Sequence, residues 1–225
     1  MFFPIGDDNI EGGYKPIVAY TFLGFNIAVF LFEFTLSPGQ CEWLFLEYGM
    51  QASEISAGQD IYTIFTSMFM HGGWMHLLGN MIFLWIFADN IEAIIGNVGF
   101  LLFYILGGIF AALVHVFIDP TSSIPSVGAS GAISAVMGAY LVMFPKSKIK
   151  VLLLFFFITF ELSAIAFLGI WFIQQLVSGV GSLGITTETS GGVAWWAHIG
   201  GFIFGLTAGY LFKKIYGNRY SYRKM

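Results

Sequence analysis

The sequence has little charge and almost no cysteine. Of its 225 residues only 10% are charged, whereas 57% are hydrophobic. Soluble domains carry about a quarter charged residues, so this composition predicts an integral membrane protein. The single cysteine, Cys41, excludes an intramolecular disulfide, a redox pair and a cysteine-ligated metal site.

Six apolar stretches are candidates to cross a bilayer, which takes roughly 20 residues of helix. They are residues 17–36, 74–87, 100–118, 130–144, 151–177 and 193–215. The fifth is long, which suggests tilt. The predicted fold is therefore an all-α bundle of six transmembrane helices over residues 17–215, with residues 1–16 as a short polar tail and residues 216–225 as a basic tail.

Lysine and arginine are absent from three of the connecting loops, residues 37–70, 119–128 and 178–192. Because basic residues favour cytoplasmic loops, we predict that both termini are cytoplasmic and that these three loops lie outside. The first outer loop contains "CEWLFLEYGM", a mixture of aromatic and acidic residues that suits a segment lying in the membrane interface.

Polar side chains recur in the first turns of the second, fourth and sixth stretches. With six spans these turns lie at similar depth near the outer face, and they carry His71, His76, Ser130 and His198. Asn80 lies four residues after His76, on the same helical face. Ionisable residues inside a membrane usually face a protein interior or a watery cavity. Two strips of small residues, which allow close helix approach, flank them: Gly131, Ser134, Ala135 and Gly138, and Ala197, Gly201, Gly205 and Gly209.

Ser130 and His198 have complementary chemistry. A serine hydroxyl becomes an effective nucleophile when a base within hydrogen-bond reach takes its proton, and histidine suits that role near neutral pH. Attack on an amide creates an oxyanion, for which His76, Asn80 and the backbone N–H of Ser130 are candidate donors. The outer halves of these three stretches contain no carboxylate, so the pattern predicts a Ser-His dyad rather than a triad.

Three motifs together resemble the rhomboid family of intramembrane serine proteases. They are "HGGWMHLLGN" at residues 71–80, "GASG" at 128–131 and "AHIGGFIFG" at 197–205. Their order, their spacing and the predicted topology also fit, so the resemblance covers about residues 20–211. It implies a rhomboid-like bundle with Ser130 as nucleophile, His198 as general base, and His76 and Asn80 as oxyanion donors.

The resemblance also implies an activity. Rhomboid proteases cleave single-span membrane proteins at small residues, near a helix-destabilised part of the transmembrane segment. Transmembrane substrates and lipids are thus the expected partners, with no nucleic acid, no cofactor and no metal. We further expect Gly128, Gly131, Gly201 and Gly205 to pack around the site and leave room for a substrate backbone.

The chain departs from the family pattern at two places. Many members carry a Trp-Arg pair in the first outer loop, where this chain has Ile61 and Tyr62, which leaves the anchoring of that loop open. Some members place an aromatic ring under the histidine, one turn after the nucleophile. This chain has Ser134 there, so support for the His198 ring must come from elsewhere.

Each candidate has a structural alternative. Ser130 could be a small packing residue, and His198 could simply join two helices by a hydrogen bond. His76 and Asn80 could bond each other or buried water. His71 lies off the His76 face and is as readily structural as functional.

Two acids and one further histidine lie outside the candidate site. Glu161 falls near the middle of the fifth stretch. It could have a function there, or it could be protonated and only form a hydrogen bond, and the sequence favours neither alternative. We expect Glu92 to have a role at a helix end or in pairing with a loop, and His115 to have a structural role.

Loops and aromatic residues suggest how a substrate would reach the site. Residues 179–192 are rich in Gly, Ser and Thr, so we predict a mobile cap over the site. The aromatic residues of the fifth stretch could form a gate for a substrate helix or be ordinary lipid-facing bulk: 155–157, Phe160, Phe167 and Trp171.

Three other functions compete with proteolysis. A transporter would need polar residues through the inner halves of several spans, but the segments "MIFLWIF" and "AVMGAYLVMF" contain almost no polar residues. A non-catalytic rhomboid-like protein that binds membrane clients differs only in not using Ser130 and His198. A zinc hydrolase is disfavoured because HExxH is absent. The compact form suggests a bacterial or archaeal plasma membrane, with the active site open to the outer face.

Overall fold

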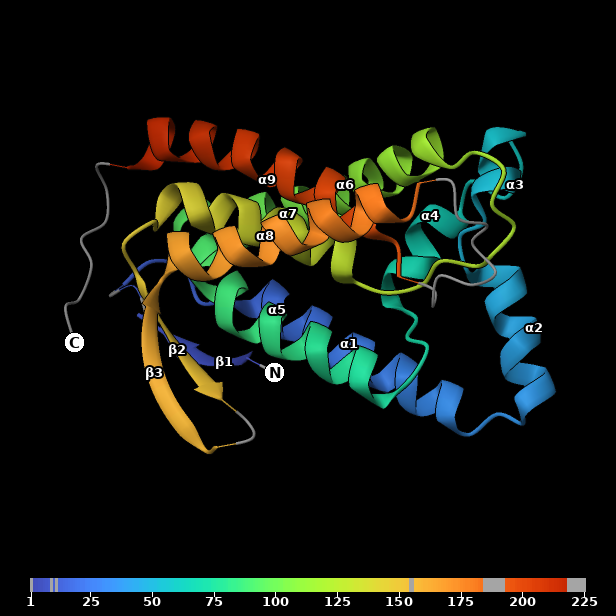
Figure 1. The fold of residues 1–225 in the computed structure, drawn as a ribbon, viewed down its shortest axis with the longest axis horizontal. Coiled ribbons are helices and arrows are strands. Elements are labelled where there is room, and N and C mark those ends of the chain that lie inside the picture. Colours follow the sequence, from blue (N-terminus) through green and yellow to red (C-terminus); the bar gives the residue numbers. More distant parts are fainter. Residues whose placement is uncertain (1, 9, 11, 154–155, 184–192, 218–225) are drawn as a thin grey trace.

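The computed structural model describes residues 2–8, 10, 12–153, 156–183 and 193–217. Its long helices run mostly along the long axis of the molecule, with a small sheet at one end and short helices at the other (Figure 1). The helices of the bundle are α1 (Ile17–Phe34), α5 (Trp74–Ile95), α6 (Asn97–Ile118), α7 (Ser130–Met143), α8 (Ala164–Gly181) and α9 (Trp195–Tyr216).

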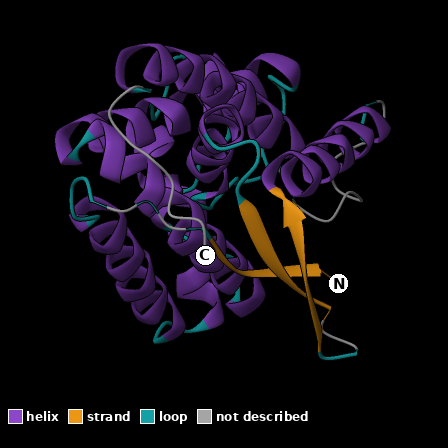
Figure 2. Ribbon diagram, turned by 90° about the vertical axis from the view of Figure 1, so that its left-hand side faces the viewer, coloured by secondary structure: helices purple, strands orange, loops and turns teal. Residues whose placement is uncertain are grey.

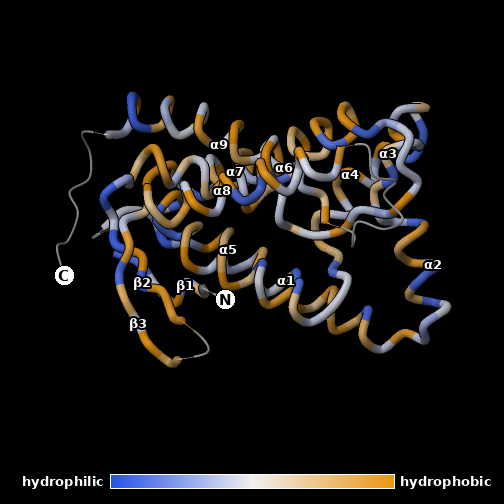
Figure 3. Tube along the Cα trace, viewed as in Figure 1, coloured by the Kyte–Doolittle hydropathy of each residue, from blue (hydrophilic) through white to orange (hydrophobic). Residues whose placement is uncertain are grey.

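Four of these helices, α1, α5, α6 and α8, are long and apolar enough to cross a membrane. The shorter α7 is apolar and almost wholly buried, because it contacts α5, α6, α8 and α9. In Figure 3 hydrophilic residues gather at the end of the bundle where α9 finishes and the strands begin. The protein is therefore a multi-pass membrane protein, and the count of six spans stays a prediction.

The all-α prediction is wrong at one end of the bundle, where three strands form an antiparallel sheet. They are β1 (Phe2–Asp7), β2 (Lys148–Leu153) and β3 (Ile158–Ser163), in the order β1-β2-β3. The fifth predicted span, 151–177, is therefore not one tilted helix, since α8 begins only at Ala164. A continuous apolar run does not by itself distinguish a strand from a buried helix.

A period-two signal at the start of β2 marks this strand. Lys148 and Lys150 are exposed, whereas Ile149 and Val151, which alternate with them, are fully buried. Successive side chains of a strand point to opposite faces, and this alternation is what that geometry produces.

The N-terminal segment contributes β1 and is not only a polar tail. Asp7 at its end accepts hydrogen bonds from Asn90 Nδ2, at 2.7 Å, and from the Tyr140 hydroxyl. Burial raises the pKa of Asp7 to about 8. Asn90 Oδ1 in turn accepts from the backbone N–H of Ile10, at 2.9 Å. The N-terminal segment is thus held against α5 and α7 by buried polar contacts.

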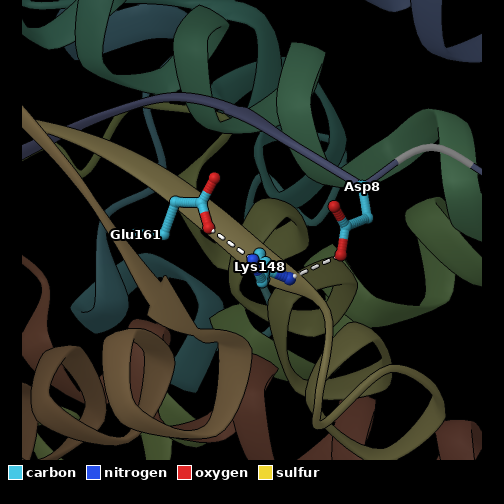
Figure 4. A network of polar contacts seen from close by, with 3 residues as sticks. All are labelled: Asp8, Lys148 and Glu161. Carbon is cyan, nitrogen blue, oxygen red and sulfur yellow. Dashed lines mark hydrogen bonds and ion pairs between the residues drawn. The ribbon is translucent and has the colours of Figure 1, made fainter. Parts of the chain in front are cut away.

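Glu161 does not lie within a membrane span. It is exposed on β3, and its carboxylate lies 2.7 Å from Lys148 Nζ. The backbone N–H of Lys148 donates to Asp8 Oδ2 at 2.9 Å, so one residue of β2 joins the neighbouring segments on both sides (Figure 4). An exposed ion pair of this kind contributes little to stability.

Glu92 has the predicted helix-end role, but it acts on another helix. Its carboxylate oxygens accept from the backbone N–H groups of Val18, at 2.8 Å, and Ala19, at 2.7 Å. These are the otherwise unpaired donors at the start of α1. The fully buried Glu92 therefore ties the start of α1 to the end of α5.

The first outer loop forms α2 (Pro38–Tyr48), α3 (Ala52–Ser56), α4 (Thr63–Thr66) and the 3₁₀ turn Ser67–Phe69. They lie at the end of the bundle opposite the sheet (Figure 1). The Tyr62 hydroxyl donates to the Glu47 carbonyl at 3.0 Å, and Thr66 Oγ1 donates to the Tyr48 carbonyl at 2.6 Å. Tyr62 thus links α2 to α4 in a loop that has no Trp-Arg pair.

Candidate active site

The start of α7 is held in place by the first outer loop. Met50 and Ser126 exchange backbone hydrogen bonds, and the N–H of Gly128 donates to the Ser67 carbonyl at 2.8 Å. Gly128 has φ +128°, a conformation that favours glycine. A Cβ there would lie 2.6 Å from His76 Nε2, so position 128 also needs glycine for space.

Small residues bring α7 and α9 into backbone contact. A Cβ on Gly201 would overlap the Gly131 carbonyl oxygen, and one on Gly205 would overlap the Ala135 carbonyl oxygen. Close approach of this kind is typical of glycine strips on membrane helices. It places Ser130 Oγ 2.8 Å from His198 Nε2.

His198 has a second partner that the sequence analysis missed. Its Nδ1 lies 2.8 Å from Oε1 of Gln175, a buried residue of α8. The Trp171 ring, one turn earlier on α8, lies 6.0 Å from the His198 ring at an angle of 34°. Support for the histidine thus comes from α8. The available signal was a pair of amides, Gln174 and Gln175, in a mostly apolar helix.

Ser134 does not contact the histidine ring. Its hydroxyl donates to the Ser130 carbonyl at 2.6 Å, within α7 itself. The N-cap of α7 is Ala129, which has no side-chain acceptor, so the first N–H groups of the helix have no side-chain cap. The backbone N–H of Ser130 belongs to this first turn, where donors lack helical partners.

Asn80 and His76 converge beside Ser130 from α5. A Cβ on Gly128 would lie 2.6 Å from His76 Nε2 and 3.5 Å from Asn80 Nδ2, so both nitrogens face the Gly128 backbone. Asn80 Nδ2 also lies 2.9 Å from His71 Nε2. The two side chains therefore do not bond each other, and each presents a nitrogen to the segment that precedes the serine.

His71 has a structural position behind Asn80. Burial lowers the pKa of His71 to about 4, so its ring is neutral at pH 7 and Nε2 accepts from the Asn80 amide. The backbone N–H of His71 donates to the buried Glu33 carboxylate of α1, at 3.2 Å to Oε2. His71 thereby fixes the orientation of Asn80 and links it to α1.

Ser130, His198, His76 and Asn80 all line one cavity of about 690 Å³. Most of its lining is apolar, and the segments before α5, α7 and α9 contribute to it. The polar side chains that line it are Ser67, His76, Asn80, Ser126, Ser130 and His198. A cavity with a mostly apolar lining and a few convergent polar groups is the usual form of a binding or active site.

Other sequence-based candidates lie elsewhere. The described residues that line the cavity do not include His115. Phe156 and Phe157 lie in the turn between β2 and β3, outside the helices. Phe167 of α8 packs against Phe83 and Phe87 of α5, so the gate for a substrate helix stays a prediction. Most of the predicted cap, 184–192, and Phe155 lie outside the described residues, and 179–181 still belong to α8.

Comparison with known proteins finds a matching family and several relatives of this chain. The sequence model of the Rhomboid domain matches residues 58–215. The chain is 37% identical over 90 residues to a zebrafish (Danio rerio) protein named presenilin-associated rhomboid-like protein A, mitochondrial, a match that covers 39% of this chain and 24% of that protein.

Two microbial relatives match longer segments. Rhomboid protease GluP of Bacillus subtilis (strain 168) is 31% identical over 128 residues, 56% of this chain and 24% of GluP. Rhomboid protein 1, mitochondrial, of Saccharomyces cerevisiae is 31% identical over 137 residues, 59% of this chain and 38% of that protein. The chain thus matches between about a quarter and two fifths of the length of these relatives. Because the domain match covers well over half of the chain and includes every polar group of the cavity named above, the chain belongs to the rhomboid family.

Proposed function

We propose that this protein is an intramembrane serine endopeptidase in which Ser130 and His198 form the catalytic dyad. The observation that carries the proposal is the 2.8 Å contact between Ser130 Oγ and His198 Nε2 inside a cavity that also holds Asn80 and His76. The name of one relative, rhomboid protease GluP, is consistent with this function.

The proposed reaction follows from these contacts. His198 Nε2 takes the Ser130 hydroxyl proton while Oγ attacks the scissile carbonyl. Asn80, His76 and the Ser130 backbone N–H stabilise the oxyanion of the tetrahedral intermediate. The proton then passes from His198 to the leaving amine, and water repeats the cycle on the acyl-enzyme to release the acid and restore Ser130.

The proposed substrates are single-span membrane proteins, cleaved at small residues in a helix-destabilised part of the transmembrane segment. Small residues border the site at Gly128 and Gly131, which leaves space for a substrate backbone. Lys148, Lys150 and Lys213 lie at the sheet end of the bundle, away from the cavity, which supports a cytoplasmic sheet and a cavity that opens to the outer face. We place the protein in a plasma membrane.

The test is labelling of the purified protein with a fluorophosphonate, which reacts with activated serines and needs no known substrate. We expect wild type to be labelled and Ser130→Ala and His198→Ala to remain unlabelled. An unlabelled wild type, beside a reactive rhomboid control, would instead support a non-catalytic client-binding protein. Labelling of Ser130→Ala equal to wild type would place the reactive serine elsewhere.

A further inference from the structure

Gln175 connects the backbone of α8 to the imidazole of His198. Its Oε1 lies 2.8 Å from His198 Nδ1, and its Nε2 donates to the Trp171 carbonyl at 3.3 Å. Gln175 is only 4% exposed, whereas its neighbour Gln174 is exposed. The two adjacent glutamines therefore have opposite environments on one helix.

The Trp171 carbonyl determines which way the Gln175 amide faces. A carbonyl oxygen can only accept a hydrogen bond, so the NH₂ group must face Trp171 and Oε1 must face His198. Because Oε1 is also only an acceptor, His198 Nδ1 must carry the ring proton. The neutral ring then has its lone pair at Nε2, which faces the Ser130 hydroxyl.

We propose that Gln175 is a positioning residue that fixes the tautomer and the ring orientation of His198. This inference rests on the proposed function, since it concerns the base of the same dyad. Gln175 does not contact Ser130; it acts through the histidine. In serine hydrolases of the triad type a carboxylate holds the ring in this way, and here a neutral amide anchored to its own helix replaces it.

The neutral amide has a chemical consequence. A carboxylate would stabilise the protonated imidazole by its full charge, whereas an amide offers only a dipole. The base of this site therefore loses its proton more readily than the base of a triad. The pH dependence of labelling reports this difference, and a merely structural role for Gln175 would not change it.

The experiment measures the rate constant of fluorophosphonate labelling against pH in wild type, Gln175→Leu, Gln175→Glu and Gln174→Leu. We expect Gln175→Leu to react about 10- to 100-fold more slowly, a part of the 10²–10⁴ that general-base catalysis supplies. Gln175→Glu should retain reactivity at high pH, and its acid limb should move up by about one pH unit or more, because a carboxylate stabilises protonated His198. Gln174→Leu is the matched control and should behave like wild type.

The outcomes separate the inference from the proposed function. An unlabelled wild type overturns the proposed function itself. A labelled wild type with a Gln175→Leu rate equal to that of Gln174→Leu overturns only the role of Gln175. If Gln175→Leu lowers the unfolding temperature as well as the rate, the Gln175→Glu profile decides, and a profile identical to that of wild type overturns the inference.

A second inference comes from the hairpin of β2 and β3, which projects away from the helices (Figures 1 and 2). Its turn exposes large apolar side chains: Phe156 is 69% exposed, Phe157 82% and Ile158 56%. Its base carries the exposed Lys150 and the exposed ion pair of Lys148 with Glu161. An apolar tip on a charged base is the amphipathic pattern of a segment that lies in a membrane interface.

We infer that the tip of this hairpin inserts into the lipid leaflet at the sheet end of the bundle. The hairpin leaves the bundle sideways (Figure 2), toward the region that lipid occupies around a multi-pass protein. The exposed Lys150 at its base complements anionic headgroups.

The test uses a single nitroxide label on the full chain in vesicles of phosphatidylcholine and phosphatidylglycerol. The background is Cys41→Ser, and the label is placed at Phe157→Cys or, as the matched control on the same hairpin, at Lys150→Cys. We expect oxygen to relax the label at 157 and a water-soluble nickel chelate to relax the label at 150. Equal access of the chelate to both sites would overturn the inference, and so would spin–spin broadening at 157 that shows a second copy covering the tip.

Discussion

Two asparagines on α5, ten positions apart, show how the two ends of this molecule differ. Asn80 and Asn90 are both buried. Asn90, at the sheet end, uses its whole amide: Oδ1 accepts from Ile10, and Nδ2 donates to Asp7 and to the Asp8 carbonyl. Asn80, at the cavity end, has one hydrogen bond among the described residues, to His71, and otherwise faces the cavity.

The difference separates polar groups that hold the fold from those available to a ligand. A saturated buried amide contributes to stability, because each of its groups has a partner that replaces water. An amide with unused donor capacity beside a cavity contributes little to stability but can bind a developing charge. Burial alone therefore does not distinguish structure from function here, and the number of partners does.

The largest expected effect comes from exchanging these two residues for alanine in turn. Asn80→Ala should lower the rate of peptide-bond cleavage by about 10²- to 10³-fold, as loss of one oxyanion donor does. It should cost less stability than Asn90→Ala, because among the described residues only His71 loses a hydrogen-bond partner. Asn90→Ala should leave the cleavage rate nearly unchanged and cost about 1–3 kcal/mol of stability. Cleavage of a transmembrane reporter and thermal unfolding in detergent measure the two effects. Loss of stability alone in Asn80→Ala would contradict the comparison.

Gly201→Ala should affect both properties, because it acts on the packing that brings Ser130 to His198. The added Cβ overlaps the Gly131 carbonyl oxygen, so α9 must move away from α7. We expect a loss of about 1–3 kcal/mol in the free energy of unfolding and slower fluorophosphonate labelling. Gly169→Ala on α8 is the control, since no atom lies within 4 Å of its added Cβ. Equal behaviour of the two variants would refute the close-packing argument.

Glu92→Ala should lower stability with little change in the chemistry at Ser130. The substitution leaves the N–H groups of Val18 and Ala19 without their acceptors, at a cost of about 2 kcal/mol. Glu42→Ala, at an exposed position of α2, provides the comparison. Thermal unfolding and labelling should be measured together, and a labelling rate that falls while the unfolding temperature is maintained would count against a purely structural Glu92.

A further expected effect, which depends on pH, comes from Asp7. Its pKa is about 8 in the folded chain and about 4 when unfolded, so between these values the folded state binds a proton that the unfolded state lacks. Stability should therefore fall as the pH rises from about 4 to about 8 and level off above that. Asp7→Asn should flatten this slope, and Asp8→Asn should keep it. Unfolding temperatures at several pH values measure the slope, and a wild-type slope in Asp7→Asn would exclude Asp7 as its source.

The sequence allowed the cavity end to be predicted better than the sheet end. Glycine strips and polar first turns indicated that Ser130 and His198 would meet, and their side chains lie 2.8 Å apart. Those signals are local in sequence, because helix spacing determines which residues share a face. At the sheet end, β1 pairs with residues of β2 that are more than 140 positions away, such as Phe2 with Leu153, and no local pattern specifies such a pairing. β2 and β3 form a local hairpin, but the continuous apolar run from residue 151 resembles a helix as much as a strand.

The error at the sheet end also concealed Gln175. When residues 151–177 are taken as one long helix, position 175 falls at the end of a tilted span, and its depth relative to His198 is undefined. With α8 beginning at Ala164, Gln175 lies in the fourth turn of an ordinary helix that contacts α9. Correct assignment of one strand pair thus changes the expected partner of a residue far from it.

Under the proposed function and six-span topology, the length of α7 sets the depth of the serine in the membrane. Its 14 residues span about 21 Å at 1.5 Å per residue, whereas the hydrocarbon core is about 30 Å thick. With the end at Met143 placed at the sheet-side boundary of the hydrocarbon, Ser130 lies about 9 Å below the opposite boundary. A bilayer of different thickness changes that distance while the helix stays the same, so the same protein would meet a different bond of a transmembrane segment in a thinner or thicker membrane.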